Sequence, residues 1–254
     1  MSVERLLLVE DDETTREVLV LLLEADGWSV RAAGSGEAAT DALAAGEVRP
    51  VVILCDLHLP GIHGGALAEA LRSMAPEAAL LAMSASESSD GAAGYQALLR
   101  KPFGPPEVRA ALAALAAAAS NTGAEPGVRS GRDSSAQNED EGGLPVVATE
   151  TFLKLEQQMG LRAKDLYAFA LADAEDRLRR MGSLPPEGIA AFQAEAHQLK
   201  GSAGMIGAQR LARLAAQAEL MDAMSSYGLR TEKVRRMHLA CDEIRLMLKT
   251  LFPI

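Results

Sequence analysis

One histidine of this sequence stands in a setting that suggests chemistry. The stretch Phe192 to Gly207 has helical periodicity, with an apolar stripe formed by Ile189, Phe192, Ala196, Leu199, Ala203 and Ile206. His197 falls outside that stripe, on the same side as Gly201 and Gly204. Glycine inside a helix costs about 0.5–1 kcal/mol relative to alanine, so these glycines predict that another surface approaches the imidazole closely. Lys200, one helical turn after His197, suits a site that binds an anionic phosphoryl group. The alternative is that His197 is an ordinary surface histidine.

A second set of reactive groups follows the short apolar runs of the N-terminal half. These groups are Glu10, Asp11 and Asp12 after the run at 6–9, Asp56 after 51–55, Ser84 after 79–83, and Lys101-Pro102 after 97–99. The carboxyl ends of parallel strands meet at one edge of a sheet, so we expect these side chains to converge. Carboxylates gathered without a cation would repel one another, and oxygen ligands of this kind suit Mg²⁺. Asp12 is better explained as the N-cap of a helix that begins at Glu13.

The elements that position the carboxylates are predicted by alternating patterns. Short apolar runs at 6–9, 28–30, 51–55, 79–83 and 97–99 alternate with amphipathic stretches. This alternation is typical of an α/β domain with a parallel five-stranded sheet covered on both faces. The first expected helix, 13–25, is apolar nearly all round. Part of it either faces a partner, such as a second copy of the chain or the C-terminal domain, or packs in the core.

The composition shifts abruptly near residue 120. Residues 120–145 lack periodicity and are rich in Gly, Ser, Asp and Glu, so they cannot offset the entropy cost of ordering. We therefore predict a domain at 1–119, a flexible linker at 120–145 and a second domain at 146–254. A linker of this length reaches about 25–30 Å, which would let Asp56 meet His197 of the same chain.

The C-terminal domain has a helical pattern throughout and predicts an all-α, antiparallel four-helix bundle. A helix opens at Thr149 and ends at Gly160, and a second covers 164–181. We expect Pro185-Pro186 to start the histidine helix, because proline suits a first helical turn. The remaining helices are predicted at 209–224 and, after a break at Gly228, at 231–251.

Charge and composition exclude several classes of protein. The 254-residue chain has 48% hydrophobic residues and a formal charge of −10, which argues against binding nucleic acid or an anionic membrane. Charged residues interrupt every apolar run before it reaches the roughly 20 residues of a membrane span. Cys55 and Cys241 show neither metal-ligand spacing nor a disulfide framework. With no signal-peptide pattern at the N-terminus, we expect a reduced, cytoplasmic protein.

The run from His197 to Gly207 resembles the H-x-L-K-G-x-x-x-x-x-G signature of histidine-containing phosphotransfer (Hpt) domains. The resemblance covers about the last 110 residues of the chain. It implies that Nε2 of His197 accepts a phosphoryl group from an aspartyl phosphate. Lys200 is then its electrostatic neighbour, and Gly201 provides clearance.

Residues 4–119 resemble the receiver domain of bacterial response regulators, which has a flavodoxin-like (βα)5 fold. The resemblance makes Asp56 the phosphoacceptor and assigns Mg²⁺ to Glu10, Asp11, Asp56 and the backbone carbonyl of His58. It also implies that Ser84 bonds the phosphoryl oxygen, and that Lys101, before a cis peptide to Pro102, pairs with the acyl phosphate. The imidazoles of His58 and His63 are assigned no catalytic role.

One position departs from the receiver pattern. Receivers that signal through a conformational switch carry an aromatic residue three positions before the lysine, but here that residue is Leu98. Tyr95 lies three residues earlier. This departure favours a domain that passes a phosphoryl group onward.

Together the resemblances imply a two-component phosphorelay protein. An upstream sensor histidine kinase would phosphorylate Asp56, and His197 would carry phosphoryl groups, with a downstream receiver as a further candidate partner. No ATP-binding kinase pattern is visible, so we expect the chain to receive phosphoryl groups rather than take them from ATP. The alternative is a response regulator whose C-terminal bundle is a protein-binding output module or a phosphate sink.

Overall fold

The computed structural model describes residues 5–85, 91–120, 144–160, 162–222 and 224–252. The chain divides into two compact units, Met1–Asn138 and Glu139–Ile254. Residues 121–143, most of the predicted linker, lie outside the described residues, so the linker stays a prediction.

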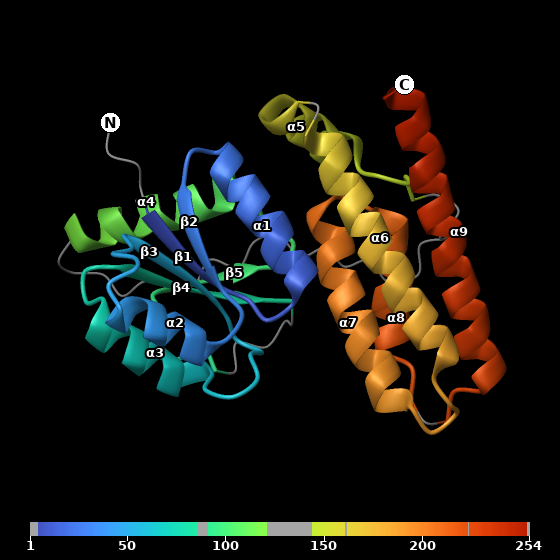
Figure 1. Ribbon diagram of the computed structural model, residues 1–254, viewed down its shortest axis with the longest axis horizontal. Helices are drawn as coiled ribbons and strands as arrows, with labels where there is room; N and C mark the ends of the chain where they lie inside the picture. Colours follow the sequence, from blue (N-terminus) through green and yellow to red (C-terminus); the bar gives the residue numbers. More distant parts are fainter. Residues whose placement is uncertain (1–4, 86–90, 121–143, 161, 223, 253–254) are drawn as a thin grey trace. The chain divides into compact units, whose positions relative to one another are not determined.

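The N-terminal unit is built on a parallel five-stranded sheet with strand order β2-β1-β3-β4-β5 (Figure 1). Its strands are β1 (Arg5–Val9), β2 (Ser29–Ala33), β3 (Val52–Asp56), β4 (Ala79–Ser84) and β5 (Ala97–Arg100). The central strands β1 and β3 are almost wholly buried, which explains why their sequences are continuous apolar runs rather than alternating ones. The predicted parallel sheet is confirmed.

Helices cover both faces of this sheet. They are α1 (Glu13–Ala25), α2 (Gly36–Ala44), α3 (Gly64–Met74) and α4 (Pro105–Ser120). In Figure 1, α2 and α3 lie on one side of the sheet and α1 and α4 on the other. Between β4 and β5, the described residues 91–96 form turns. That connection of twelve residues, 85–96, is close to the shortest that can join two neighbouring parallel strands.

The helix α1 begins where predicted. Asp12 is its N-cap, with the Asp12 carboxylate accepting a hydrogen bond of 2.8 Å from the backbone N–H of Thr15. This bond satisfies one of the amide groups left without a partner at a helix start. The helix buries Val18, Leu19, Leu22 and Leu23, whereas Val20 and Leu21 are half-buried. Most of the apolar surface of α1 is therefore core.

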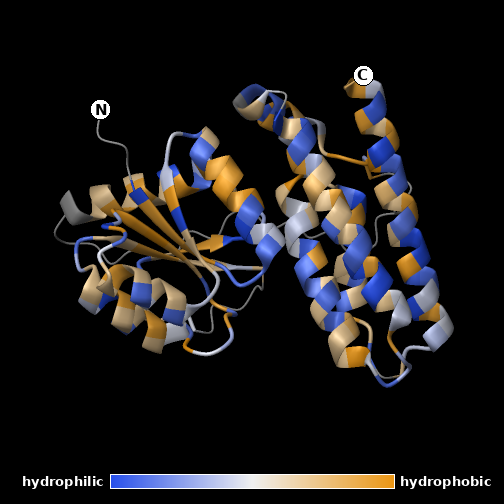
Figure 2. Ribbon diagram, viewed as in Figure 1, coloured by the Kyte–Doolittle hydropathy of each residue, from blue (hydrophilic) through white to orange (hydrophobic). Residues whose placement is uncertain are grey.

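The described residues of the C-terminal unit form helices and short connections, with no strand among them. Its helices are α5 (Thr149–Met159), α6 (Arg162–Ser183), α7 (Ile189–Met205), α8 (Gln209–Glu219) and α9 (Tyr227–Leu251). The helices α6, α7, α8 and α9 close a ring in which each packs against two others, and α5 packs on α6. Figure 2 shows apolar residues striping these helices, as expected for a bundle with one shared core.

The predicted apolar stripe of the histidine helix is confirmed at Phe192, Ala196, Leu199, Ala203 and Ile206, which are all buried, whereas Ile189 is only half-buried. Several boundaries differ from the prediction. The helix α6 spans Arg162–Ser183 rather than 164–181. The helix α7 begins at Ile189 with Gly188 as its N-cap, so the proline pair precedes it. The helix α8 ends at Glu219 rather than at 224. Gly228 lies inside α9, whose start is set by Ser226 accepting from the N–H of Leu229.

Gly207 shapes the turn between α7 and α8. It has a positive φ of 72°, a conformation that glycine adopts far more readily than other residues. A Cβ added there would lie 2.6 Å from Cβ of Thr151 on α5. The carbonyl of Gly207 also accepts a 2.8 Å bond from the N–H of Ala148. This glycine therefore fixes the turn and lets α5 pack against it.

Candidate functional site

The carboxylates of the N-terminal unit converge at the carboxyl ends of β1 and β3. The register pairs Val9 with Cys55, which brings Glu10 beside Asp56. Glu10 is 1% exposed and Asp56 6% exposed. One ligand oxygen from each of Glu10, Asp11 and Asp56 can be chosen so that all three lie within 4.8 Å of one another. The predicted gathering of these side chains is therefore observed.

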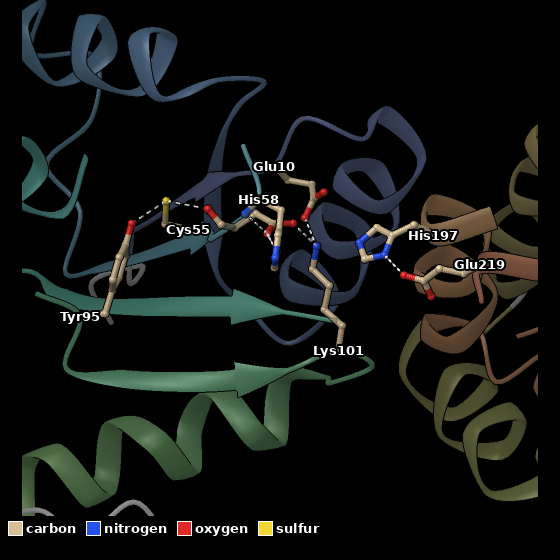
Figure 3. Close-up of polar contacts among 8 residues, drawn as sticks. Glu10, Cys55, His58, Tyr95, Lys101, His197 and Glu219 are labelled. Atoms are coloured by element: carbon tan, nitrogen blue, oxygen red, sulfur yellow. Dashed lines mark hydrogen bonds and ion pairs between the residues drawn. The ribbon is translucent and has the colours of Figure 1, made fainter. Parts of the chain in front are cut away.

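Lys101 joins two of the carboxylates, as Figure 3 shows. Its Nζ lies 2.5 Å from Oε2 of Glu10 and 2.5 Å from Oδ2 of Asp56. The lysine side chain is 7% exposed, so this ammonium is held among carboxylates away from bulk water. It follows β5 directly, and the peptide bond between Lys101 and Pro102 is cis, as predicted.

Burial and charge act differently on the two carboxyl groups. Burial raises the pKa of Glu10 to about 8, with Asp56 adding to the effect and Lys101 opposing it. Burial also opposes ionisation of Asp56, but hydrogen bonds from His58 and the charge of Lys101 outweigh it and hold the Asp56 pKa well below its usual range. Asp56 is thus kept as a carboxylate, whereas Glu10 readily takes a proton when no further cation is present.

Ser84 and His58 lie at the same edge of the sheet. Ser84 is fully buried at the end of β4, next to Met83, which pairs with Asp56. The backbone N–H of His58 donates to Oδ1 of Asp56 at 2.9 Å. The His58 imidazole is half exposed, with Nδ1 3.7 Å from the same oxygen, and the Asp56 carboxylate raises its pKa despite some burial. His63 is the N-cap of α3, and its side chain makes no capping bond.

Arg16 was not identified from the sequence. Its guanidinium donates from Nη1 to the backbone carbonyls of Glu10 and Asp11, at 2.8 and 3.0 Å. These bonds hold the loop between β1 and α1 that carries the acidic residues. A basic residue in the first turn of the helix after such a loop was the available signal, but which groups it contacts depends on the fold of the loop.

In the C-terminal unit, His197 lies on α7 with a partly exposed side chain. Its Nδ1 is 2.6 Å from Oε1 of Glu219, the last residue of α8. Lys200 lies one turn along α7, and its Nζ is 2.7 Å from Oε2 of the same carboxylate. Gly201, the other predicted site residue of this helix, is half-buried. One carboxylate therefore holds both the imidazole and the ammonium; Figure 3 shows its contact with His197.

Glu219 was also missed by sequence reasoning. Burial opposes its ionisation, but hydrogen bonds from Lys200 and His197 outweigh the burial and lower its pKa. Glu219 thus accepts a hydrogen bond from Nδ1–H of His197. In this tautomer of the imidazole, the lone pair lies on Nε2. The sequence offers only a glutamate within the amphipathic helix predicted at 209–224, 22 residues from the histidine.

Two family models match the chain in separate places. Residues 6–113 match the response regulator receiver domain, and residues 165–251 match the Hpt domain. The chain joins a receiver domain to an Hpt domain. The acidic cluster with Lys101 lies in the first, and His197 with Glu219 lies in the second.

Two curated response regulators are similar to part of this chain. The DNA-binding response regulator MtrA of Mycolicibacterium paratuberculosis is 30% identical over 109 residues, which cover 41% of this chain and 48% of MtrA. The response regulator MprA of Mycobacterium bovis is 36% identical over 120 residues, covering 45% of this chain and 51% of MprA. The chain thus spans about half the length of these curated relatives.

Among solved structures, the chemotaxis response regulator CheY4 of Vibrio cholerae is 25% identical, with a TM-score of 0.39. The match covers 44% of this chain and 98% of CheY4. Within the described residues, no helix is both long and apolar enough to cross a membrane.

Behind the acidic cluster, the receiver domain has a second polar contact that the sequence did not reveal. The Tyr95 hydroxyl lies 3.3 Å from Sγ of Cys55, and this thiol lies 3.5 Å from the backbone carbonyl of Asp56. Burial raises the pKa of Cys55 to about 12, so the sulfur stays a thiol. Tyr95 therefore contacts Cys55, the residue that precedes Asp56, whereas Leu98 is half-buried in β5 (Figure 3).

The acidic cluster fits a divalent cation. Its three carboxylates offer hard oxygen ligands at one edge of the sheet, as Mg²⁺ prefers. Burial raises the pKa of Glu10 even though Lys101 lowers it, so a further cation at this cluster would favour the ionised form of Glu10. Receiver domains in general bind Mg²⁺ at such an acidic pocket.

Proposed function

We propose that this chain is a phosphorelay protein whose receiver domain accepts a phosphoryl group on Asp56 and whose Hpt domain carries one on His197. The observation that carries the proposal is the pairing of two complementary sites in one chain. One is a buried carboxylate joined to a buried ammonium, and the other is a partly exposed imidazole held by a carboxylate. Phosphoryl transfer between aspartate and histidine needs both kinds of group.

The receiver step would begin with a phosphohistidine of a sensor histidine kinase. The P–N bond of that donor breaks as Oδ of Asp56 forms a P–O bond, and the donor imidazole keeps the electron pair and takes up a proton. Lys101 would neutralise charge that develops on the transferred group, and Ser84 would bond a phosphoryl oxygen. Mg²⁺ held by Glu10, Asp11, Asp56 and the carbonyl of His58 would supply further charge neutralisation.

The Hpt step would use Nε2 of His197 as the nucleophile. Glu219 holds Nδ1–H, so the lone pair lies on Nε2, and the charge of Glu219 stabilises the imidazole as it becomes cationic. The P–O bond of an aspartyl phosphate breaks, and the aspartate leaves as a carboxylate. Lys200 would offset charge on the phosphoryl group, and Gly201 would leave room for the donor domain. The donor aspartate is Asp56 or that of a separate receiver.

Neither matched domain takes phosphoryl groups from ATP, so we propose that the chain receives them from phosphorylated partners. The same proposal places the protein in the cytoplasm, where both of its cysteines would remain free thiols, as they are here.

The experiment is phosphosite analysis of the whole chain with Mg²⁺ and either acetyl phosphate or a phosphorylated sensor kinase. Wild type is compared with Asp56→Asn and His197→Gln. We expect base-labile label on Asp56, absent from Asp56→Asn, and acid-labile, base-stable label on His197, absent from His197→Gln. Label on His197 that disappears in Asp56→Asn would show transfer within the protein. Label that persists in the double variant would overturn the proposal.

A further inference from the structure

Two apolar side chains next to the histidine site are almost fully exposed. Leu220 is 83% exposed and Met224 is 91% exposed, the highest values among the large apolar side chains of the described residues. Leu220 is the C-cap of α8 and directly follows Glu219, whose carboxylate lies 2.6 Å from Nδ1 of His197. Apolar surface grouped in this way is a common feature of protein interaction sites.

The connection between α8 and α9, which carries both side chains, is held by hydrogen bonds. The side-chain amide of Gln193 on α7 donates to the backbone carbonyl of Met221 at 2.8 Å. Oδ1 of Asp222 accepts from the backbone N–H groups of Met224 and Ser225, at 3.0 and 2.9 Å. Met221 is only 7% exposed. The connection therefore buries one apolar side chain and leaves two in water, although its backbone is fixed.

A protein that delivers a phosphoryl group to His197 must cover this surface. Transfer needs the reacting atoms about 3–3.5 Å apart, and a specific protein complex buries about 800 Å² of each partner, a patch roughly 30 Å across. Leu220 follows the residue that contacts the imidazole, so it falls inside such a patch. Met224 lies on the same connection, which Gln193 ties to α7 one turn before His197. A small phosphoryl donor would leave both side chains in water.

Charge indicates which kind of protein can approach. Residues 146–254 hold 15 lysines and arginines against 13 aspartates and glutamates, whereas residues 1–119 hold 8 against 17. The formal charge of −10 thus comes from the receiver domain and the residues between the two domains, not from the Hpt domain. An acidic receiver domain would meet no net repulsion from the Hpt domain, and apolar contact could then hold it at short range.

We propose that Leu220 and Met224 form a docking surface for the acidic receiver domain that donates a phosphoryl group to His197. The inference rests on the proposed function, because it assigns a partner to the same site. Docking would bury the two side chains and place the aspartyl phosphate against Nε2. The P–O bond of the donor then breaks as the P–N bond forms, and the aspartate leaves as a carboxylate. The docking surface takes no part in these bond changes and acts only by raising the fraction of bound donor.

The test uses full-length variants in two roles. The donor is His197→Gln, labelled on Asp56 with acetyl phosphate and Mg²⁺ and then desalted. The acceptor is Asp56→Asn, which keeps His197, and the same acceptor carrying Leu220→Ser or Met224→Ser in addition. Label on His197 is followed over a range of donor concentrations. We expect Leu220→Ser to slow transfer about tenfold at low donor concentration and to leave the rate at saturating donor unchanged, because only binding is weakened. Met224→Ser should act in the same direction.

The matched control is Leu246→Ser, added to the same acceptor. Leu246 is a 68% exposed leucine of α9 and lies about 28 Å along that helix from its start, so its replacement should keep the full transfer rate. Labelling of His197 by phosphoramidate, a small P–N donor, measures the reactivity of the imidazole without docking. Each transfer rate is therefore divided by the phosphoramidate rate of the same acceptor.

The possible results separate the docking surface from the proposed function. Equal transfer rates for Leu220→Ser and Leu246→Ser would overturn the docking surface and leave the proposed function intact. A wild-type dimer in sedimentation that Leu220→Ser dissociates without slowing transfer would also overturn it, because the surface would then join two copies. So would a loss of equal size with phosphoramidate. If neither donor labels His197 in the parent acceptor, the proposed function fails, and the docking surface fails with it.

Discussion

Asp56 in the receiver domain and His197 in the Hpt domain are held in different ways. The Asp56 side chain is 9% exposed and contacts a buried ammonium, whereas the His197 side chain is 31% exposed and contacts a carboxylate. A carboxylate is a weak nucleophile toward phosphorus, so its site must place positive charge in a low-dielectric environment before reaction. An imidazole is a better nucleophile, so orientation of its ring suffices. The amount of buried charge follows the difficulty of the chemistry that each domain is proposed to perform.

The largest effect should come from Lys101→Met in the receiver domain. This change leaves Glu10 and Asp56 without the ammonium that contacts both, and it removes the cation proposed to neutralise the phosphoryl group. We expect phosphorylation of Asp56 by acetyl phosphate to slow by a factor of about 100 or more, measured by phosphoprotein electrophoresis over time. The control is Lys154→Met, which removes an exposed lysine paired with Glu150. Equal phosphorylation rates in the two variants would contradict the role given to the buried ammonium of Lys101.

The next largest effect is expected from Gly207→Ala, in the turn that follows the histidine helix α7. Gly207→Ala places a Cβ at a positive φ and against Thr151, so we expect unfolding of the Hpt domain to become easier by about 1–3 kcal/mol. Gly228→Ala is the matched control, since Gly228 lies in α9 with no atom near its added Cβ. That change should stabilise the domain by about 0.4–1 kcal/mol. Calorimetry that showed the same sign for both variants would rule out the packing described for Gly207.

A smaller effect is expected from Glu219→Gln. Glutamine keeps a hydrogen-bond acceptor but loses the charge that holds His197 and Lys200. A charge-assisted hydrogen bond is stronger than a neutral one by about 1–1.5 kcal/mol, so phosphoryl acceptance by His197 should slow roughly tenfold. The rate is measured with a phosphorylated receiver as donor, and Glu232→Gln, on an exposed pair with Arg235, is the control. An unchanged rate would contradict the role given to Glu219, because it would show that His197 accepts the phosphoryl group equally well without the carboxylate.

The two domains should also differ in how their stability depends on pH. In the receiver domain without metal, the pKa values of Glu10 and His58 are both raised, so the folded state binds more protons than the unfolded chain. Its melting temperature should therefore fall as pH rises from about 5 to 8. Mg²⁺ should reverse part of the loss, because it competes with the proton of Glu10 and binds better at high pH. Calorimetric scans at several pH values, with and without Mg²⁺, measure this. A receiver domain that gained stability over this range would contradict the sign.

The sequence was sufficient to predict the structure of those parts of the chain in which local pattern and long-range packing agree. The five strands were predicted because short apolar runs alternate with amphipathic helical stretches. Asp12 was predicted as a cap because capping needs only the residues that follow it. The convergence of Glu10, Asp11 and Asp56 followed from one rule of parallel sheets. None of these predictions needs the position of a distant side chain.

The remainder could not be predicted because it depends on how separate elements pack. Glu219 reaches His197 only because α8 ends beside that turn of α7, and Arg16 reaches two carbonyls only because the β1–α1 loop folds back. Gly228 was predicted to break a helix, but it lies in the first turn of α9, where the cap at Ser226 outweighs its low helix propensity. The roles assigned to the site residues stay predictions, and the variants above test them.

The packing around Trp28 has a practical consequence. Trp28 is the single tryptophan of the chain, is 4% exposed and lies under the guanidinium of Arg109, 5.1 Å from its ring centre. Arg109 also pairs with Asp26 at the end of α1, so the indole is enclosed between α1 and α4. Its fluorescence therefore reports on one domain only. Excitation at the indole band can follow unfolding of the receiver domain while the helical bundle, which has no tryptophan, stays optically silent.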